Sequence, residues 1–257
     1  VISALVALGL GFSFENLNQY NEQTEGIQDR LGVMFFIQMY YGLMSLSSLP
    51  IWRRDQQVFI HERASGVYGT LSYFSASVLT DLIPYRVIPP CIFTAICYPM
   101  IGLAGGGKWK IFLGIIILLN LSMSAIMMLI GVIAASNAVA NAAGSLVVLF
   151  FLLFCGYLQN SGGIPDDFLW LQSMSPCYYG YNALVANEFD GIKELCITTI
   201  LGGETLTSDP FTGKEILDCL NLGKLSIGED IRVLACITAG TIGCTFLVMI
   251  CFLREAR

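Results

Sequence analysis

Charged residues are scarce in this 257-residue chain, and histidine is almost absent. The sequence holds 13 lysines and arginines, 19 aspartates and glutamates and one histidine, so 12% of it is charged. A soluble domain carries about twice that share. No basic cluster of the kind that binds nucleic acid is present. His61 is alone and no CxxC pair exists, which excludes a zinc site. The scarcity of charge points to a protein that lies largely in a membrane.

Long apolar runs support this interpretation. Hydrophobic residues make up 55% of the chain and the mean hydropathy is +0.70. The apolar segments are residues 1–14, 31–52, 78–103, 111–135, 142–158 and 231–253. The first is too short to cross a membrane, and we interpret it as the end of a truncated span; the others approach or exceed the roughly 30 Å of a bilayer core. We therefore expect an all-α membrane protein of six spans, with the third span extending over 73–104 once its flanking residues are included.

The connecting segments alternate between the two sides of the membrane. One side holds residues 53–72, the short connector between the fourth and fifth spans, and the C-terminal tail; the other holds residues 15–30, 105–110 and 159–230. Lysine and arginine in the short loops number five on the first side (Arg53, Arg54, Arg63, Arg254 and Arg257) and three on the second (Arg30, Lys108 and Lys110). The positive-inside tendency then places the 53–72 loop in the cytosol.

The long segment 159–230 has two parts. Residues 168–171 and 176–186 are too short and interrupted to cross the membrane, yet too apolar to remain in water, which favours a re-entrant or interfacial helix pair. Residues 190–230 are polar and rich in glycine and threonine. They predict a small external cap before the last span.

A series of short motifs joins the first polar loop to the third span: FIHER at 59–63, GVY at 66–68, SYF at 72–74 and DLIP at 81–84, followed by Pro89. This order resembles the ABC-2 type transmembrane domain of White-type (G subfamily) ABC transporters, and most of all the breast cancer resistance protein type of multidrug half transporter. The resemblance implies the membrane half of an ATP-driven exporter that moves amphipathic, lipid-like or xenobiotic molecules outward. It also implies a nucleotide-binding domain ahead of Val1 in the same polypeptide, a homo- or heterodimer of half transporters in contact with membrane lipid, and a location in the plasma membrane.

The resemblance also suggests site residues. The loop residues His61, Glu62 and Arg63 are expected to couple to the nucleotide-binding domain. A substrate cavity between the second and fifth spans is expected to involve Tyr40, Leu43, Arg86, Leu149 and Leu152. Leu43 occupies the place of the family's clamping phenylalanine. Tyr157 and Leu158 match the two leucines of the outer gate, with a tyrosine replacing one leucine.

Two charges near the inner end of the third span are costly in hydrocarbon. Asp81 and Arg86 are five residues apart across Pro84. In the first interpretation they form a stabilising pair near the membrane interface. In the second, Arg86 lines or shapes the translocation path. The family resemblance favours the second, because related multidrug transporters have an arginine here that influences substrate choice.

Cysteines and a nucleotide-like motif complete the sequence. Six of the nine cysteines fall within spans and Cys177 in the re-entrant segment, whereas Cys196 and Cys219 lie in the cap, where the resemblance implies a disulfide. Residues 102–108 match the G-x-x-x-x-G-K core of a P-loop, but Trp109 replaces the magnesium-binding Ser or Thr. We therefore expect no cofactor in this chain, and ATP with Mg²⁺ in the separate nucleotide-binding domain.

Two other classes of protein fit parts of the pattern. A channel or receptor with a re-entrant pore loop has similar hydropathy, but it calls for a polar filter or a ring of charge, and residues 178–189 offer only Glu188 and aromatic side chains. An intramembrane enzyme is disfavoured because spans four to six contain no acidic, histidine or lysine residue.

Overall fold

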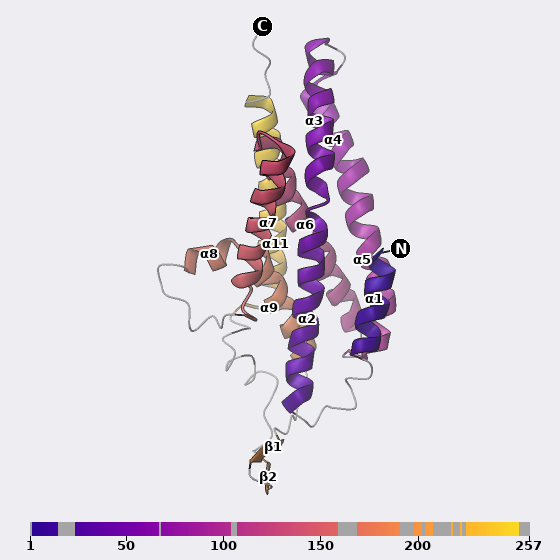
Figure 1. Ribbon diagram of the computed structural model, residues 1–257, viewed down its shortest axis with the longest axis vertical. Helices are drawn as coiled ribbons and strands as arrows, with labels where there is room; N and C mark the ends of the chain where they lie inside the picture. Colours follow the sequence, from indigo (N-terminus) through magenta and orange to yellow (C-terminus); the bar gives the residue numbers. More distant parts are fainter. Residues whose placement is uncertain are drawn as a thin grey trace.

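The computed structural model describes residues 2–14, 24–66, 68–103, 107–158, 169–190, 198–201, 204–207, 217, 222 and 225–251. Its helices are α1 (Ile2–Ser13), α2 (Thr24–Ser45), α3 (Ser48–Ala64), α4 (Thr70–Ser77), the π-helical η2 (Val78–Leu82), α5 (Ile83–Ile101), α6 (Lys108–Ile133), α7 (Asn137–Leu153), α8 (Leu169–Met174), α9 (Pro176–Phe189) and α11 (Ile227–Cys251). The strands β1 (Thr198–Leu201) and β2 (Glu204–Thr207) pair as an antiparallel hairpin. The helices form an elongated bundle (Figure 1).

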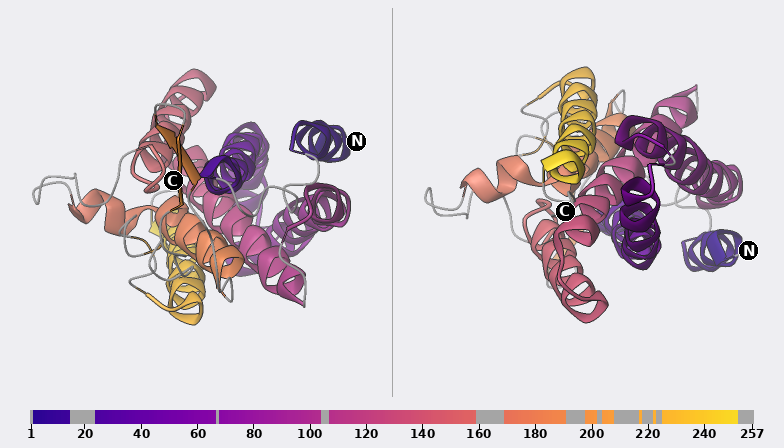
Figure 2. Two further views of the ribbon diagram at one scale, coloured as in Figure 1. Left: turned by 90° about the horizontal axis from the view of Figure 1, so that it is seen from below. Right: turned by 90° about the horizontal axis from the view of Figure 1, so that it is seen from above.

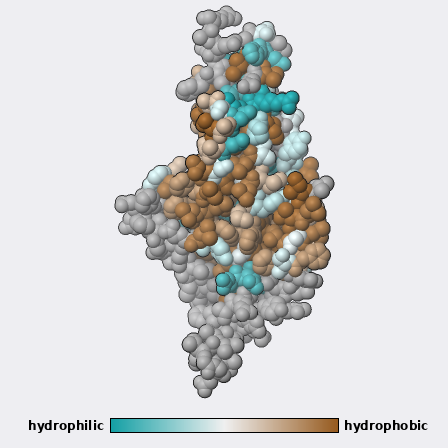
Figure 3. Space-filling model, in the orientation of Figure 1, coloured by the Kyte–Doolittle hydropathy of each residue, from teal (hydrophilic) through white to brown (hydrophobic). Residues whose placement is uncertain are grey.

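The all-α membrane fold is confirmed. Within the described part of the chain, three helices are long and apolar enough to cross a membrane on their own: Ile27–Arg63, Lys108–Ile133 and Ile227–Cys251. The helices Ile2–Ser13 and Asn137–Leu153 are apolar but shorter. Hydrophobic side chains cover the middle of the face shown in Figure 3, and hydrophilic ones gather toward the end that carries α3. The hairpin, which the sequence analysis did not anticipate, lies at the opposite end of the bundle (Figure 1).

Two helices differ from the expected boundaries around residues 46–72. The second span is divided, because Pro50 has no N–H to bond the carbonyl of Leu46, and Leu49 N donates to that carbonyl instead, at 3.1 Å. The expected loop 53–72 is helical as far as Ala64. Trp52 and Phe59, seven residues apart, are both buried and give α3 an apolar face. The charged residues of this stretch therefore lie on a helix, with Arg54 exposed and the others half-buried.

Helix α6 occupies the centre of the bundle and contacts α2, α3, α5, α7, α9 and α11. The close approach of α3 to α6 and α7 depends on a glycine in each of the latter two helices. A Cβ at Gly144 would lie 2.6 Å from Leu49 Cδ1, and one at Gly131 would lie 3.3 Å from the Leu49 carbonyl oxygen. Leu49 thus fits against two helices at once, which fixes the start of α3 relative to α6 and α7.

Helix α1 lies at the edge of the bundle and packs against α5 (Figures 1 and 2). Its buried residues are Ser3, Ala7 and Gly11, spaced four apart, as in small-residue interfaces between membrane helices. A Cβ at Gly11 would come within 2.8 Å of the Met100 sulfur. The expected truncated span is therefore a packed helix.

Helix α9 is buried on nearly all sides. Its 14 residues extend about 21 Å, less than the thickness of a bilayer core. Polar groups join it to two other helices: Gln38 of α2 donates to the Cys177 carbonyl, and Asn182 of α9 donates to Asp230 of α11 at 2.7 Å. A short buried helix anchored in this way has the character expected of a re-entrant element.

Candidate functional site

The exposed apolar side chains of α2 and α7 include two of the five residues expected in the substrate cavity. Leu43 is 48% exposed and Leu149 is 59% exposed. The two helices are in contact at Gly42 and Val148, because a Cβ on Gly42 would lie 3.4 Å from Val148 Cγ1. Gly42 directly precedes Leu43, and Val148 directly precedes Leu149. Other exposed apolar residues of the two helices are Phe36, Val139, Leu146, Phe150 and Leu153. We call the exposed apolar residues of α2 and α7 the α2–α7 face.

Two further residues expected in the cavity pack against other parts of the protein, Tyr40 half-buried and Leu152 buried. Tyr40 donates to Ser3 Oγ at 3.1 Å and stacks on Phe93 with 5.8 Å between ring centroids, so its ring packs toward α1 and α5. Leu152 is 5% exposed and belongs to the main hydrophobic core. Of the five expected cavity residues, Leu43 and Leu149 are therefore the ones on the α2–α7 face.

Arg86 lies at the junction between α2 and α3. Its guanidinium donates to the Met44 carbonyl at 3.2 Å, to Ser47 Oγ at 3.1 Å and to Ser48 Oγ. These acceptors flank the helix break caused by Pro50, where carbonyl groups lack helical partners. The side chain of Asp81 lies outside the described residues. Arg86 is 7% exposed, so it stabilises the α2–α3 junction from inside the protein. One of its acceptors, Met44, is the residue that follows Leu43.

A second helix contact supports the backbone beside Arg86. Pro90 lacks the N–H that would bond the carbonyl of Arg86 four residues earlier. Asn120 of α6 donates to that carbonyl at 2.9 Å instead. The position of Arg86 is thus fixed by α6 as well as by its own helix.

The two expected gate residues have different environments. Helix α7 ends at Leu153, and Gly156 adopts a φ of 102°, which turns the chain away from the helix axis. Tyr157 stacks on Phe35 with centroids 4.7 Å apart and contacts Tyr181 edge-on at 6.0 Å. Leu158 is 58% exposed. Tyr157 thus links α2 to α9, whereas the exposed side chain of Leu158 is available to contact another protein or a substrate.

The expected coupling residues lie on a helical end built from aromatic rings. Phe59 is fully buried and stacks with Tyr73 at 4.5 Å and Tyr68 at 6.2 Å, and the Arg63 guanidinium lies 5.9 Å from the Phe59 ring centroid. The Tyr68 hydroxyl donates to Glu62. Burial, followed by this hydrogen bond, raises the pKa of Tyr68 to about 12, so the phenol remains a donor at neutral pH. His61 is exposed.

This end of the molecule is fastened to the central helix. Arg53 donates through both terminal nitrogens to the carbonyls of Ala134 and Ala135, the second at 2.6 Å, just beyond the C-terminus of α6. Gln56 donates to the Val132 carbonyl at 3.2 Å. A cation at a helix C-terminus also complements the helix dipole. Movement of α3 would therefore be transmitted to α6.

The sequence analysis missed an ion pair between Arg30 of α2 and Glu188 of α9. The two side chains are 5% and 1% exposed, and 158 residues separate them in the chain. Arg30 was counted as a loop residue, and Glu188 was considered only as the charge of a pore loop. The signal available was the cost of an intramembrane carboxylate, which requires a partner. Cys196 and Cys219 lie outside the described residues, so their disulfide stays a prediction.

A helical membrane bundle with an exposed apolar face at mid-height and a charged helical platform at one end is the architecture of a transporter membrane domain. The chain belongs to the ABC-2 type transporter family, whose model matches residues 1–189. The resemblance to G-subfamily transporters is confirmed by similar proteins of that group.

Three relatives illustrate the similarity. ABC transporter G family member 24 of Dictyostelium discoideum is 40% identical over 74% of this chain. The broad substrate specificity ATP-binding cassette transporter ABCG2 of Bos taurus is 33% identical over 84%, and a probable ATP-dependent permease of Saccharomyces cerevisiae is 30% identical over 91%. The chain spans 16%, 33% and 22% of the lengths of these three proteins, respectively.

Proposed function

We propose that this chain is the membrane half of an ATP-driven exporter that moves amphipathic, lipid-like or xenobiotic molecules out across the membrane. The similarity to an ATP-binding cassette transporter described as having broad substrate specificity supports this choice of substrates. The α2–α7 face, apolar and exposed, is suited to such molecules. Tyr40, Arg86 and Leu152 shape that face from behind, while Leu43 and Leu149 contact the substrate. Tyr157 and Leu158 form the outer gate, with Leu158 as the closing residue.

One observation carries the proposal: two consecutive helices, α2 and α3, join the apolar face to the charged end. The helical stretch Ile27–Arg63 is 37 residues long, which corresponds to about 55 Å. A bilayer core takes up roughly 30 Å of that length, so the end carrying Glu62 and Arg63 projects into water. Force applied there is carried along α3 to the Arg86 junction and on to Leu43. This is the connection that ATP-driven transport requires.

The proposal includes partners that the chain does not contain. We infer a nucleotide-binding domain ahead of Val1, with ATP and Mg²⁺ bound in it, contacting His61, Glu62 and Arg63. We also infer a second half transporter, identical or different, placed so that two α2–α7 faces enclose the substrate. The plasma membrane is the proposed location.

Changing Tyr68 to phenylalanine in the full-length protein tests the coupling end. The variant keeps the stacked ring but frees Glu62, so the carboxylate is no longer held against the helix. A hydrogen bond to a charged group is worth about 1.5 kcal/mol or more, and we expect ATP-driven transport to fall by roughly tenfold while ATP binding is unchanged. The measurements are transport of a fluorescent amphiphile and binding of a nucleotide analogue.

The matched control is Tyr179→Phe, which removes a hydroxyl bonded to the Ser173 carbonyl in the α8–α9 region. Its transport rate should stay near that of the unmodified protein. Equal effects of the two changes would contradict a coupling role for the α3 end.

A further inference from the structure

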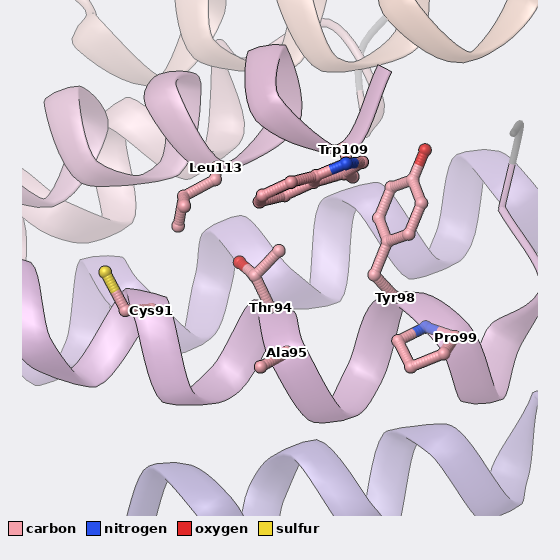
Figure 4. Close-up of a pocket in the computed structure, with 7 residues that line it drawn as sticks. All are labelled: Cys91, Thr94, Ala95, Tyr98, Pro99, Trp109 and Leu113. Carbon is pink, nitrogen blue, oxygen red and sulfur yellow. The ribbon is translucent and has the colours of Figure 1, made fainter. Parts of the chain in front are cut away.

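A pocket opens between α5 and α6, lined by neither of the helices that form the α2–α7 face. Its volume is about 220 Å³, and the described residues that line it are Cys91, Thr94, Ala95, Tyr98, Pro99, Trp109 and Leu113. Figure 4 shows Thr94 pointing from α5 toward α6, between Leu113 and Trp109. The walls are mostly apolar. The pocket thus offers a small apolar recess with a polar group directed into it.

The hydroxyl of Thr94 differs from those of several other helical serines and threonines among the described residues. Thr80, Ser124 and Thr245 each donate to the carbonyl four residues earlier, at 2.7–2.9 Å. The Thr94 side chain is buried, at 3% exposed, and its hydroxyl oxygen has no hydrogen-bond partner among the residues that the structure describes. A buried hydroxyl without a partner is costly. A ligand that hydrogen-bonds to it would remove that cost.

A backbone acceptor lies on the same turn of α5. Pro99 has no N–H, so the carbonyl of Ala95 lacks the helical donor that it would otherwise meet four residues later. Ala95 and Pro99 both line the pocket. Thr94 can donate or accept, and the Ala95 carbonyl accepts. A group that both donates and accepts, such as an alcohol, satisfies the two together.

The pocket lies close to one end of its helices. Trp109 is the second residue of α6, is 46% exposed and has the Lys110 ammonium 5.8 Å from its ring. Tryptophan flanked by lysine marks the interface between membrane and water. Thr94 is seven residues before the end of α5, about 10 Å deeper. A head group entering from the interface would reach the hydroxyl, and its chain would continue along the apolar surface.

We propose that this pocket binds the hydroxyl head of a neutral, single-chain lipid such as a long-chain alcohol or a monoacylglycerol. Thr94 and the carbonyl of Ala95 hydrogen-bond with the hydroxyl, and Trp109 and Leu113 contact the first part of the chain. The pocket carries no charged side chain among its described lining residues, which disfavours phosphate and ammonium head groups. Its volume is below the 300 Å³ or more typical of pockets for drug-sized ligands, so a fused-ring body does not fit inside it.

Photolabelling tests the proposal in the full-length protein reconstituted in phosphatidylcholine vesicles. The probe is octadecanol with a diazirine near the head, and the labelled peptides are identified by mass spectrometry. We expect saturable labelling of residues 91–113 that unlabelled octadecanol displaces and octadecane does not. Thr94→Val should raise the octadecanol concentration needed for half displacement by about fivefold, and Thr94→Ser should leave it unchanged.

The control variant is Thr241→Val, whose hydroxyl already donates to the Ile237 carbonyl at 2.8 Å. The octadecanol concentration needed for half displacement should be the same in this variant as in the unmodified protein. Non-saturable labelling, or displacement by octadecane as effective as by octadecanol, would overturn the proposal in favour of ordinary annular lipid. Stronger displacement by cholesterol than by octadecanol would overturn the choice of a single-chain lipid. If Thr94→Val fails to fold, the octadecanol and octadecane competition on the unmodified protein still decides.

Discussion

Replacing Arg30 with alanine is expected to leave little folded protein after extraction from the membrane. Glu188 would remain buried, at 1% exposed, without its cationic partner. Breaking a buried ion pair from one side costs about 3–5 kcal/mol, against the 5–15 kcal/mol that typically separates folded from unfolded states. The contact also joins α2 to α9. We therefore expect the substitution to lower the monodisperse fraction in size-exclusion chromatography and the midpoint of thermal unfolding.

A double substitution separates the ion pair from simple loss of packing. Arg30→Met with Glu188→Leu removes both charges and keeps apolar volume, so it should be more stable than either single variant. The control is Lys110→Met, which removes an exposed charge at the start of α6 and should be nearly neutral. Single variants at Arg30 or Glu188 that melt like the unmodified protein would contradict the structural role of the pair.

Substituting Arg86 with glycine or threonine is expected to change which substrates are exported. The guanidinium makes three hydrogen bonds at the α2–α3 junction, one of them to the carbonyl of Met44, which follows Leu43 of the α2–α7 face. Without them the junction relaxes and the α2–α7 face changes shape. Cationic substrates should gain most, because a positive charge is removed. We expect the transport ratio of cationic to neutral substrates to rise by about tenfold, equivalent to about 1.4 kcal/mol.

Arg86→Lys should lie closer to the unmodified protein, since lysine keeps the charge and can still donate, although it lacks the planar fork that reaches several acceptors. The measurement is a panel of neutral and cationic fluorescent substrates, normalised to protein at the cell surface. A uniform fall for every substrate, with less protein at the surface, would assign Arg86 to packing alone.

Hydropathy predicted the helical rods well because the cost of burying charge in hydrocarbon governs where membrane segments occur. It missed the division of the second span. Pro50 lies within an apolar run, and its effect on the Leu46 carbonyl appears only when backbone hydrogen bonds are followed. The charges of residues 53–64 were interpreted as a loop, although Trp52 and Phe59 carried the periodicity of a half-buried helix.

The site was predicted in parts. Leu43 and Leu149 were predicted from the family resemblance; the structure places both on the exposed α2–α7 face, and their contact with substrate stays a prediction. Tyr157 was expected to close a gate, but its stacking on Phe35 depends on the turn at Gly156 and on tertiary packing. The Arg30–Glu188 pair joins residues 158 positions apart, so the sequence indicates that Glu188 needs a partner but not which residue supplies it.

ATP dependence of uptake into inside-out vesicles is the most direct test of the central claim. Vesicles containing the full-length protein should accumulate a fluorescent amphiphile against its gradient when supplied with ATP and Mg²⁺. They should fail to do so with a non-hydrolysable ATP analogue. Flux that runs only down the gradient and is the same with and without ATP would contradict the account and indicate a channel.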